Sequence, residues 1–212
     1  MIKPKKNNVK MIHINKTGGT SVCEWLSPIL EFSEPRDITG EGKGRSCHRI
    51  IEEFSDNFFY FTIVRNPYDR VASHFFQWSH QQNVGRGEES RWLSDDIKDL
   101  NDFVLKAFNN SSLDFIKEKY KSRHQPEYLL PCTYWIRDFN KVKIFKLEKL
   151  NELRKFFQEH FPRHPNIQNK IPISESTKTK GLHKYEHLYN ESSKVIIREV
   201  FEDDFNNFGY KK

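Results

Sequence analysis

Cysteine is scarce in this chain of 212 residues, which contains only Cys23, Cys47 and Cys132. The number is odd, the positions are widely spaced, and no two of them form a Cys-x-x-Cys pair. The sequence therefore indicates neither a disulfide framework nor a zinc site, because both need paired cysteines or ligand spacing. Small buried or half-buried thiols are the remaining interpretation.

Long hydrophobic runs are missing as well. Hydrophobic residues make up 36% of the chain, and the basic segment MIKPKKNN leads only into a short apolar run. No segment approaches the roughly 20 apolar residues that cross a membrane as a helix. We therefore expect a chain without a membrane anchor. Since it also lacks internal repeats and an inter-domain linker, residues 1–212 are expected to form one domain.

Nucleic-acid-binding signatures are absent too. The net charge of +6 favours anionic ligands. The basic residues are scattered among acidic ones, however, which is typical of a solvated surface. We therefore expect a small anionic ligand and no nucleic acid as partner.

The most informative segment is Met11–Ser21, MIHINKTGGTS, where an apolar run stops at a lysine, two glycines and hydroxyl residues. The pattern predicts a buried strand over Val9–Ile14, and the glycines allow a tight turn that comes close to a ligand. A helix is expected to begin near Thr20, so that its unpaired N–H groups and the positive end of its dipole face the turn. Together with the charge of Lys16, these features predict a phosphate site.

The order of residues in this turn differs from the nucleotide-triphosphate loop G-x-x-x-x-G-K-[ST], in which lysine follows the glycines and the next hydroxyl holds magnesium. Here Lys16 precedes Gly18 and Gly19. The inversion argues against an ATPase or an ordinary kinase and favours a phosphate site that needs no metal. The segment alone leaves open a glycine-rich structural turn with a solvated lysine.

A second strand-to-helix junction follows. The run FFYFTIV at Phe58–Val64 predicts a strand buried on both faces. It ends at Arg65, whose planar fork of donors suits phosphate. Asn66 suits a helix N-cap and Pro67 the first helical position. Ser73 lies about two turns further along the same helix face.

The remaining segments complete an α/β pattern. A third strand is predicted over Lys141–Leu147, and helices are predicted in Cys47–Phe54, twice in Leu93–Tyr120, over Leu150–Phe161 and over Tyr185–Phe201. Together these elements predict a single three-layer domain with a central parallel sheet and a P-loop-like strand, loop and helix. Ligands of such sheets bind beyond the carboxyl ends of the strands, so Lys16 and Arg65 mark two phosphate stations in one crevice.

The segments NKTGGTS and IVRNPYDRVASHFFQW, about fifty residues apart, resemble the two cofactor signatures of sulfotransferases that use 3′-phosphoadenosine 5′-phosphosulfate (PAPS). The pattern is most similar to the branch that sulfates carbohydrates of the heparan, chondroitin and dermatan type. Weaker similarities are Gln125 in HQPEYLL, Glu148 in IFKLEKL and the ending FEDDFNNFGY. The branch usually has proline where this chain has Asn15, which we interpret as a loop change because that proline contributes rigidity and no ligand.

The resemblance implies transfer of a sulfuryl group from PAPS to an acceptor hydroxyl by in-line displacement, with adenosine 3′,5′-bisphosphate as product. It implies that Arg65 and Ser73 bind the 3′-phosphate. The residues expected around the 5′-phosphosulfate end are Lys16, Thr17, Gly18, Gly19, Thr20 and Ser21. A carbohydrate or another hydroxyl compound is the expected acceptor. Because animal members are usually anchored in the Golgi, a chain without an anchor implies a cytoplasmic protein of bacterial or viral type, or a trimmed lumenal domain.

Sulfuryl transfer also needs a base for the acceptor's proton. The resemblance places the base at His48, in RSCHRIIEEF, and gives Lys16 the task of neutralising charge on the leaving phosphate. Glu52 and Glu53 are alternatives, because many sulfotransferases use glutamate, and a surface or capping role for His48 stays open. Packing, rim or exposed-face positions are expected for His74, His80, His183 and His187.

Two other functions stay open at this point. A kinase-like phosphoryl transferase would need magnesium carboxylates beside a G-K-[ST] lysine, which the sequence lacks. A non-catalytic binder of nucleic acid or anionic glycan would use both turns only to hold phosphates or sulfates. Binding of adenosine 3′,5′-bisphosphate, compared with ATP plus magnesium and with oligonucleotides, distinguishes the three.

Overall fold

A computed structural model describes residues 2–32, 38, 50–83, 97–108, 129–172 and 185–212. The chain divides into two compact units, each built from two stretches. The first unit consists of Met1–Arg65 and Tyr134–Ser174, and the second of Asn66–Thr133 and Glu175–Lys212. The first boundary directly follows Arg65, the second lies inside a short helix, α5, at Cys132–Trp135, and the third follows Ser174.

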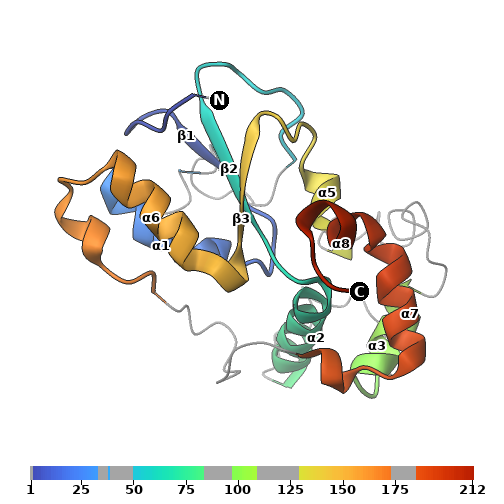
Figure 1. The fold of residues 1–212 in the computed structure, drawn as a ribbon. Helices are drawn as coiled ribbons and strands as arrows, with labels where there is room; N and C mark the ends of the chain where they lie inside the picture. Colours follow the sequence, from blue (N-terminus) through green and yellow to red (C-terminus); the bar gives the residue numbers. More distant parts are fainter. Residues whose placement is uncertain (1, 33–37, 39–49, 84–96, 109–128, 173–184) are drawn as a thin grey trace. The chain divides into compact units, whose positions relative to one another are not determined.

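The first unit contains a three-stranded parallel sheet in the order β1-β2-β3 (Figure 1). Its strands are β1 at Val9–Ile12, β2 at Phe59–Val64 and β3 at Val142–Lys146. The central strand, β2, pairs on both sides and is buried along its whole length. The predicted α/β class and parallel pairing are therefore confirmed for these strands.

Helices α1 (Gly19–Leu30) and α6 (Leu150–His160) pack on one face of this sheet. The ring of Phe157 in α6 lies 5.4 Å from that of Phe61 in β2 and 6.3 Å from that of Trp25 in α1. Aromatic side chains thus fill the space between the helices and the sheet, as expected where eighteen phenylalanines supply much of the buried area. A 3₁₀ turn, η3 (Leu147–Lys149), joins β3 to α6, and a second, η4 (Pro165–Gln168), follows α6. The three-layer arrangement stays a prediction.

Strand β1 is shorter than predicted. It ends at Ile12, because the Ile14 amide turns back to donate to the Ile12 carbonyl at 3.2 Å. The hydroxyl of Thr62 donates to the same carbonyl at 2.7 Å. The helix predicted over Cys47–Phe54 is wrong for residues 50–54, which are not helical; residues 47–49 lie outside the described part.

The second unit is helical. Its long helices are α2 (Pro67–Asn83), α3 (Leu100–Phe108) and α7 (Glu191–Val200), and it ends in α8 (Glu202–Phe208). Ring contacts join parts of this unit: Phe75 of α2 with Phe103 of α3, Phe108 of α3 with Phe201 between α7 and α8, and Tyr68 of α2 with Phe205 of α8. Of the two helices predicted in Leu93–Tyr120, α3 is confirmed, and residues 109–120 lie outside the described part.

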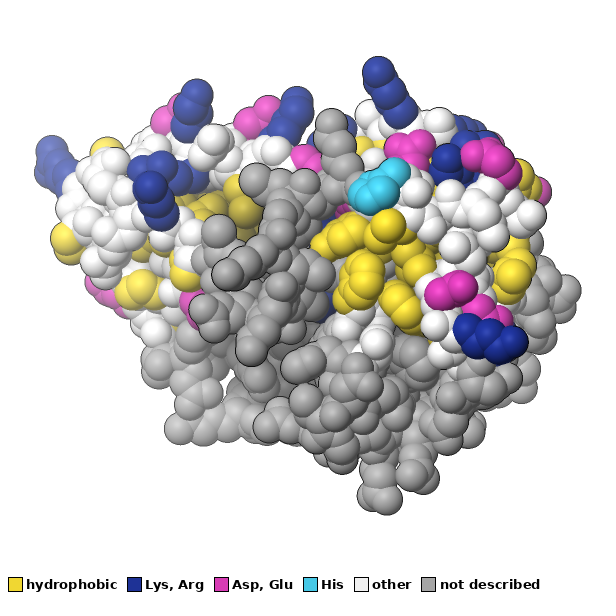
Figure 2. Space-filling model, turned by 90° about the horizontal axis from the view of Figure 1, so that it is seen from below, with side chains coloured by type: hydrophobic (Ala, Val, Ile, Leu, Met, Phe, Trp, Pro, Cys, Tyr) yellow, Lys and Arg dark blue, Asp and Glu magenta, His cyan; other side chains and the backbone are white. Residues whose placement is uncertain are grey.

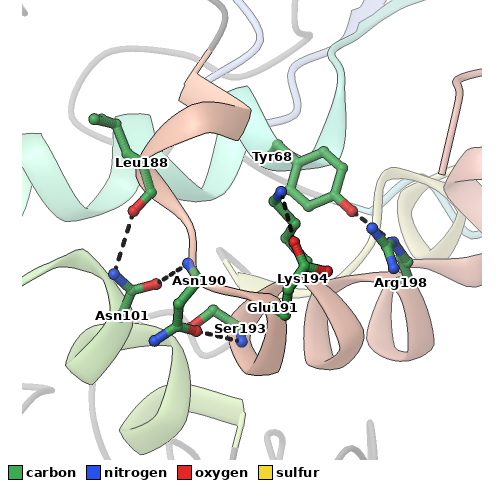
Figure 3. A network of polar contacts seen from close by, with 8 residues as sticks. All are labelled: Tyr68, Asn101, Leu188, Asn190, Glu191, Ser193, Lys194 and Arg198. Carbon is green, nitrogen blue, oxygen red and sulfur yellow. Dashed lines mark hydrogen bonds and ion pairs between the residues drawn. The ribbon is translucent and has the colours of Figure 1, made fainter.

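The helix predicted over Tyr185–Phe201 is instead a 3₁₀ turn, η5 (Tyr185–Leu188), followed by α7. Figure 3 shows the cause: the side chain of Asn101, from α3, donates to the Leu188 carbonyl at 3.2 Å and accepts from the Asn190 amide at 2.9 Å. Asn190 then caps α7 by accepting from the Ser193 amide at 2.9 Å. These side-chain bonds satisfy the backbone groups that a continuous helix would pair.

Charges of both signs are mixed on the surface. In Figure 2, lysine and arginine side chains stand with acidic ones among them, and hydrophobic side chains reach the surface beside a histidine. Exposed ion pairs join Lys6 to Glu31 and, at 2.7 Å, Lys212 to Glu202. None of the helices in the described part of the chain has the length and apolar character needed to span a bilayer.

Candidate functional site

The turn between β1 and α1 is stabilised by contacts among its own residues. Lys16 has a φ of 61° and Gly18 a φ of 81°, so two left-handed residues reverse the chain within a few positions. Thr17 lies between them, fully buried, and its hydroxyl donates to the Ile14 carbonyl at 2.7 Å. The side chain of Thr17 therefore holds the turn together from inside, whereas Thr20 is exposed and Ser21 half-buried.

Gly18 and Gly19 allow other atoms to come close to the backbone of the turn, and in this structure those atoms belong to other residues of the protein. A methyl group on Gly18 would lie 2.6 Å from Cδ1 of Leu147, and one on Gly19 would lie well under 3.0 Å from the imidazole of His13. Real Cβ atoms essentially never come within 3.0 Å of such neighbours. The predicted tight turn is confirmed by the φ of Gly18, and both glycines let the start of α1 pack against the rest of the unit.

The N-terminus of α1 offers backbone donors at this turn. Its capping residue is Gly18, which has no side chain to accept from the first N–H groups, and the first turn contains no acidic residue. The positive end of the helix dipole is therefore not compensated within the helix itself. The predicted helix start near Thr20 is confirmed, since α1 begins at Gly19.

Two cations meet beside this turn. Arg65, at the end of β2, is only 5% exposed, and its Nη1 donates to the Lys16 carbonyl at 3.2 Å. Burial, and next the positive charge of Arg65, lower the pKa of Lys16 from 10.5 to about 8. Within the described part of the chain no carboxylate pairs with Lys16. The first unit thus brings Lys16 and Arg65 together, as the sequence predicted.

The second signature begins as predicted at the level of local structure. Helix α2 starts at Pro67, and the side chain of Asn66 accepts from the Tyr68 amide at 2.9 Å as its cap. Arg65 belongs to the first unit, whereas Ser73 is buried on α2 in the second unit, with 6% of its surface exposed.

The structure describes two of the three candidate bases, Glu52 and Glu53. His48 lies outside the described residues, as do His183 and Gln125. Glu52 and Glu53 are exposed, and Glu52 lies 3.6 Å from Nε of Arg137 in an ion pair.

The described side chains among the other candidate residues are one buried histidine and two exposed groups. His74 is buried, His187 is exposed in η5, and Glu148 is exposed in η3. The His80 side chain lies outside the described part. Among the described side chains, no group of three or more His, Cys, Asp or Glu residues is placed to hold a metal ion.

Comparison with known proteins adds the decisive observation. The model of the sulfotransferase family matches residues 1–211, which include both units. The chain belongs to the sulfotransferase family. It is therefore a PAPS-dependent enzyme of sulfuryl transfer. Neither the curated proteins nor the solved structures gave a match.

The residues of the first turn fit the anionic donor of a sulfotransferase. Two cations lie together, Arg65 buried and Lys16 half-buried, and the start of α1, which has no side-chain cap, lies at the same turn. An anion placed there offsets the repulsion between Lys16 and Arg65, which burial strengthens by reducing solvent screening.

Sequence reasoning missed several residues that hold the second signature of this sulfotransferase. Arg70 is 1% exposed and donates through Nη1 to the Leu130 carbonyl at 2.7 Å. Asp204 is fully buried and accepts from the amides of Cys132 and Thr133 at 2.7 and 2.8 Å. Burial raises the pKa of Asp204, and Arg70 opposes that shift. The signal in the sequence is the ending FEDDFNNFGY, which contains Asp204 but does not by itself indicate what that carboxylate contacts.

Tyr68 is the other missed residue of this signature. The hydroxyl of Tyr189 donates to the Tyr68 carbonyl at 2.7 Å. In addition, Nε of Arg198 donates to the Tyr68 hydroxyl at 3.0 Å, as Figure 3 shows. The first turn of α2 is therefore held by Arg198 of α7 and by Tyr189, which lies between η5 and the cap of α7. Nothing in the local sequence reveals these partners, which follow Tyr68 by 121 and 130 positions.

Proposed function

We propose that this sulfotransferase binds the 5′-phosphosulfate end of PAPS at the turn between β1 and α1 and transfers the sulfuryl group to a carbohydrate hydroxyl. The observation that carries the proposal is the contact of half-buried Lys16 with buried Arg65, beyond the carboxyl ends of the adjacent parallel strands β1 and β2. In sheets of this kind ligands bind at that edge. The likeness of both signatures to the carbohydrate-sulfating branch supports the choice of acceptor.

The turn residues have different tasks in this proposal. The amides of Gly18 and Gly19, and the amides and hydroxyls of Thr20 and Ser21, donate to the 5′ end. Thr17 contributes only its backbone, because its buried hydroxyl already donates to the Ile14 carbonyl.

Arg65 and Ser73 hold the 3′-phosphate. Arg65 supplies a charged fork of donors and Ser73 a hydroxyl on α2, the helix that follows Arg65 directly in the chain. Because the family match extends over both units, we further propose that residues 1–212 act as one sulfotransferase domain.

When bound, PAPS supplies the sulfuryl group, whose bond to the bridging phosphate oxygen breaks as the acceptor's oxygen bonds to sulfur. Lys16 neutralises the charge that develops on the leaving phosphate, an interaction stronger in the transition state than in the ground state. His48 accepts the proton of the attacking hydroxyl.

The base assignment is tested by comparing three variants. His48→Ala should bind adenosine 3′,5′-bisphosphate normally and lose about two to four orders of magnitude in sulfuryl transfer, as expected for a general base. The wild-type rate should rise with pH through an apparent pKa of about 6.5, and this limb should vanish in the variant. If Glu52→Gln or Glu53→Gln loses the activity that His48→Ala keeps, the base is a glutamate.

The donor and acceptor are tested separately. Thermal shift with adenosine 3′,5′-bisphosphate should exceed that with ATP plus magnesium or with oligonucleotides. Transfer of labelled sulfate from PAPS to a panel of glycans, with hydroxylated non-carbohydrate compounds as controls, identifies the acceptor class. Label appearing only on the non-carbohydrate compounds would rule out the carbohydrate proposal and leave the donor site intact.

A further inference from the structure

We infer that His13 is a positioning residue of this sulfotransferase: its imidazole sets where the N-terminus of α1 stands. His13 is the first residue after β1, and it is 5% exposed. Its ring edge lies against Gly19, the first residue of α1, in the space that any side chain at position 19 would need. The ring therefore lies directly between the end of β1 and the first residue of α1.

The contact has a direct consequence for the donor site. Amides at a helix N-terminus bind an anion only where they point at it, and hydrogen bonds weaken steeply as their angle and length depart from the optimum. The Cα of Gly19 can move no closer to β1 than the imidazole of His13 allows. Met11 also borders this space, but its Cε lies 3.0 Å from where a methyl group on Gly19 would stand, and it ends a flexible side chain. The rigid ring thus limits how closely the start of α1 can approach β1.

The inference rests on the proposed function in one respect, namely that the amides at the start of α1 bind the 5′ end of the donor. In that case His13 acts on donor affinity through Gly19, without touching the reacting atoms. His13→Ala should raise the KM for PAPS about threefold to tenfold while kcat changes less than twofold.

A double-variant cycle tests the contact itself. Gly19→Ala places a methyl group where the ring stands, so it should weaken binding of adenosine 3′,5′-bisphosphate by at least thirtyfold. In the double variant His13→Ala/Gly19→Ala the methyl group has room, and affinity should return to within about tenfold of wild type. Two residues that act independently would instead give the product of their separate losses.

Gly18→Ala is the matched control. Its methyl group meets Leu147, and its φ of 81° is unfavourable for alanine whatever the space. His13→Ala should therefore not rescue Gly18→Ala, whereas it should rescue Gly19→Ala. If Gly19→Ala does not fold, recovery of a cooperative thermal transition in the double variant supports the same contact, and a double variant that also fails to fold overturns it.

The possible failures are distinguishable. If Gly19→Ala weakens nucleotide binding and His13→Ala gives no rescue, the positioning role of His13 is wrong and the donor site stands. If a folded Gly19→Ala binds the nucleotide like wild type, the helix start does not contact the donor, and both the site proposal and this inference fall. Rescue of Gly18→Ala to the same extent as Gly19→Ala would show general loosening of the turn and would also overturn the inference.

Discussion

The two strand-to-helix junctions of this sulfotransferase differ in how each helix begins. At the first junction six residues separate β1 from α1, and the capping residue Gly18 has no side chain to accept from the helix amides. At the second, two residues separate β2 from α2, and Asn66 accepts from the Tyr68 amide. A side chain thus already pairs with one amide at the N-terminus of α2, whereas no side chain caps that of α1.

The comparison teaches that similar strand-to-helix patterns can offer an anion different groups. In the proposed site the first junction would contribute backbone donors together with the charge of Lys16, and the second the side chains of Arg65 and Ser73. Arg65 also joins the two signatures within the first unit, because it donates to the Lys16 carbonyl at 3.2 Å. Substitutions at the first junction should therefore affect the reaction, and those at the second should affect nucleotide selectivity and stability.

Removal of the Lys16 charge should have the largest effect at these junctions. Lys16→Ala should lower kcat by about 10²- to 10³-fold, the usual effect of losing one donor that stabilises developing charge. Affinity for adenosine 3′,5′-bisphosphate should fall less than kcat does. Steady-state kinetics and titration calorimetry measure the two quantities. A variant with full kcat and only a raised KM would show that Lys16 binds the donor without stabilising the transition state.

Arg65→Ala should have the next largest effect. It should lower the preference of the enzyme for nucleotides that have a 3′-phosphate. Loss of charge-assisted hydrogen bonds suggests about 1.5–3 kcal/mol, or roughly ten- to a hundredfold weaker binding of adenosine 3′,5′-bisphosphate. Adenosine 5′-phosphate, which lacks the 3′ group, should lose much less, although the contact of Arg65 with the Lys16 carbonyl predicts some loss for it too. Equal losses for both nucleotides would contradict the 3′-phosphate assignment. Arg65→Lys, which keeps the charge without the fork, is the control.

A change of pH should affect the binding of adenosine 3′,5′-bisphosphate less than these two substitutions do, and it should act through Lys16. Lys16 is charged below its pKa of about 8 and neutral above it. The protonated fraction therefore falls from about 0.9 at pH 7 to about 0.1 at pH 9, so binding of adenosine 3′,5′-bisphosphate should weaken by about tenfold over that range. In Lys16→Arg, which stays charged, this decrease should disappear. Affinity that is constant to pH 9.5 in the wild type would show that the lysine charge does not contact the nucleotide.

The lowered pKa of Lys16 also predicts how the stability of the free enzyme depends on pH. The folded state holds fewer protons at Lys16 than the unfolded state between pH 8 and 10.5. Without nucleotide, stability contributed by this group should therefore rise with pH across that window, and the rise should be absent in Lys16→Met. The free enzyme thus gains stability over a pH range in which nucleotide binding weakens. Urea unfolding at several pH values measures this difference.

Local pattern was enough to predict the features that neighbouring residues decide. The three strands, the start of α2 at Pro67 and the cap at Asn66 follow from runs of apolar residues and from the chemistry of asparagine and proline. The proximity of Lys16 and Arg65 followed from the rule that the carboxyl ends of neighbouring parallel strands lie at one edge of the sheet.

Contacts between distant segments decided what the sequence did not reveal. Asn101 breaks the predicted helix at Leu188, 87 positions further along the chain. The His13 ring and Gly19 meet only because β1 and α1 pack together, and a glycine in a phosphate-binding pattern suggests a ligand before it suggests a histidine. Tertiary partners thus overrode local pattern at these positions.

The substitution with the smallest expected effect, Asn66→Ala, tests whether the N-terminus of α2 is capped by the protein and does not bind the donor. Asn66→Ala removes the side chain that caps α2, so the free energy of unfolding should fall by about 1 kcal/mol, as for other helix caps. Binding of adenosine 3′,5′-bisphosphate should change less than threefold, because the α2 amides serve the protein rather than the ligand. Asn66→Asp, which keeps an accepting oxygen, should retain the stability. A large loss of nucleotide affinity with unchanged stability would mean that α2, like α1, presents its N-terminus to the donor, and the contrast between the two junctions would then disappear.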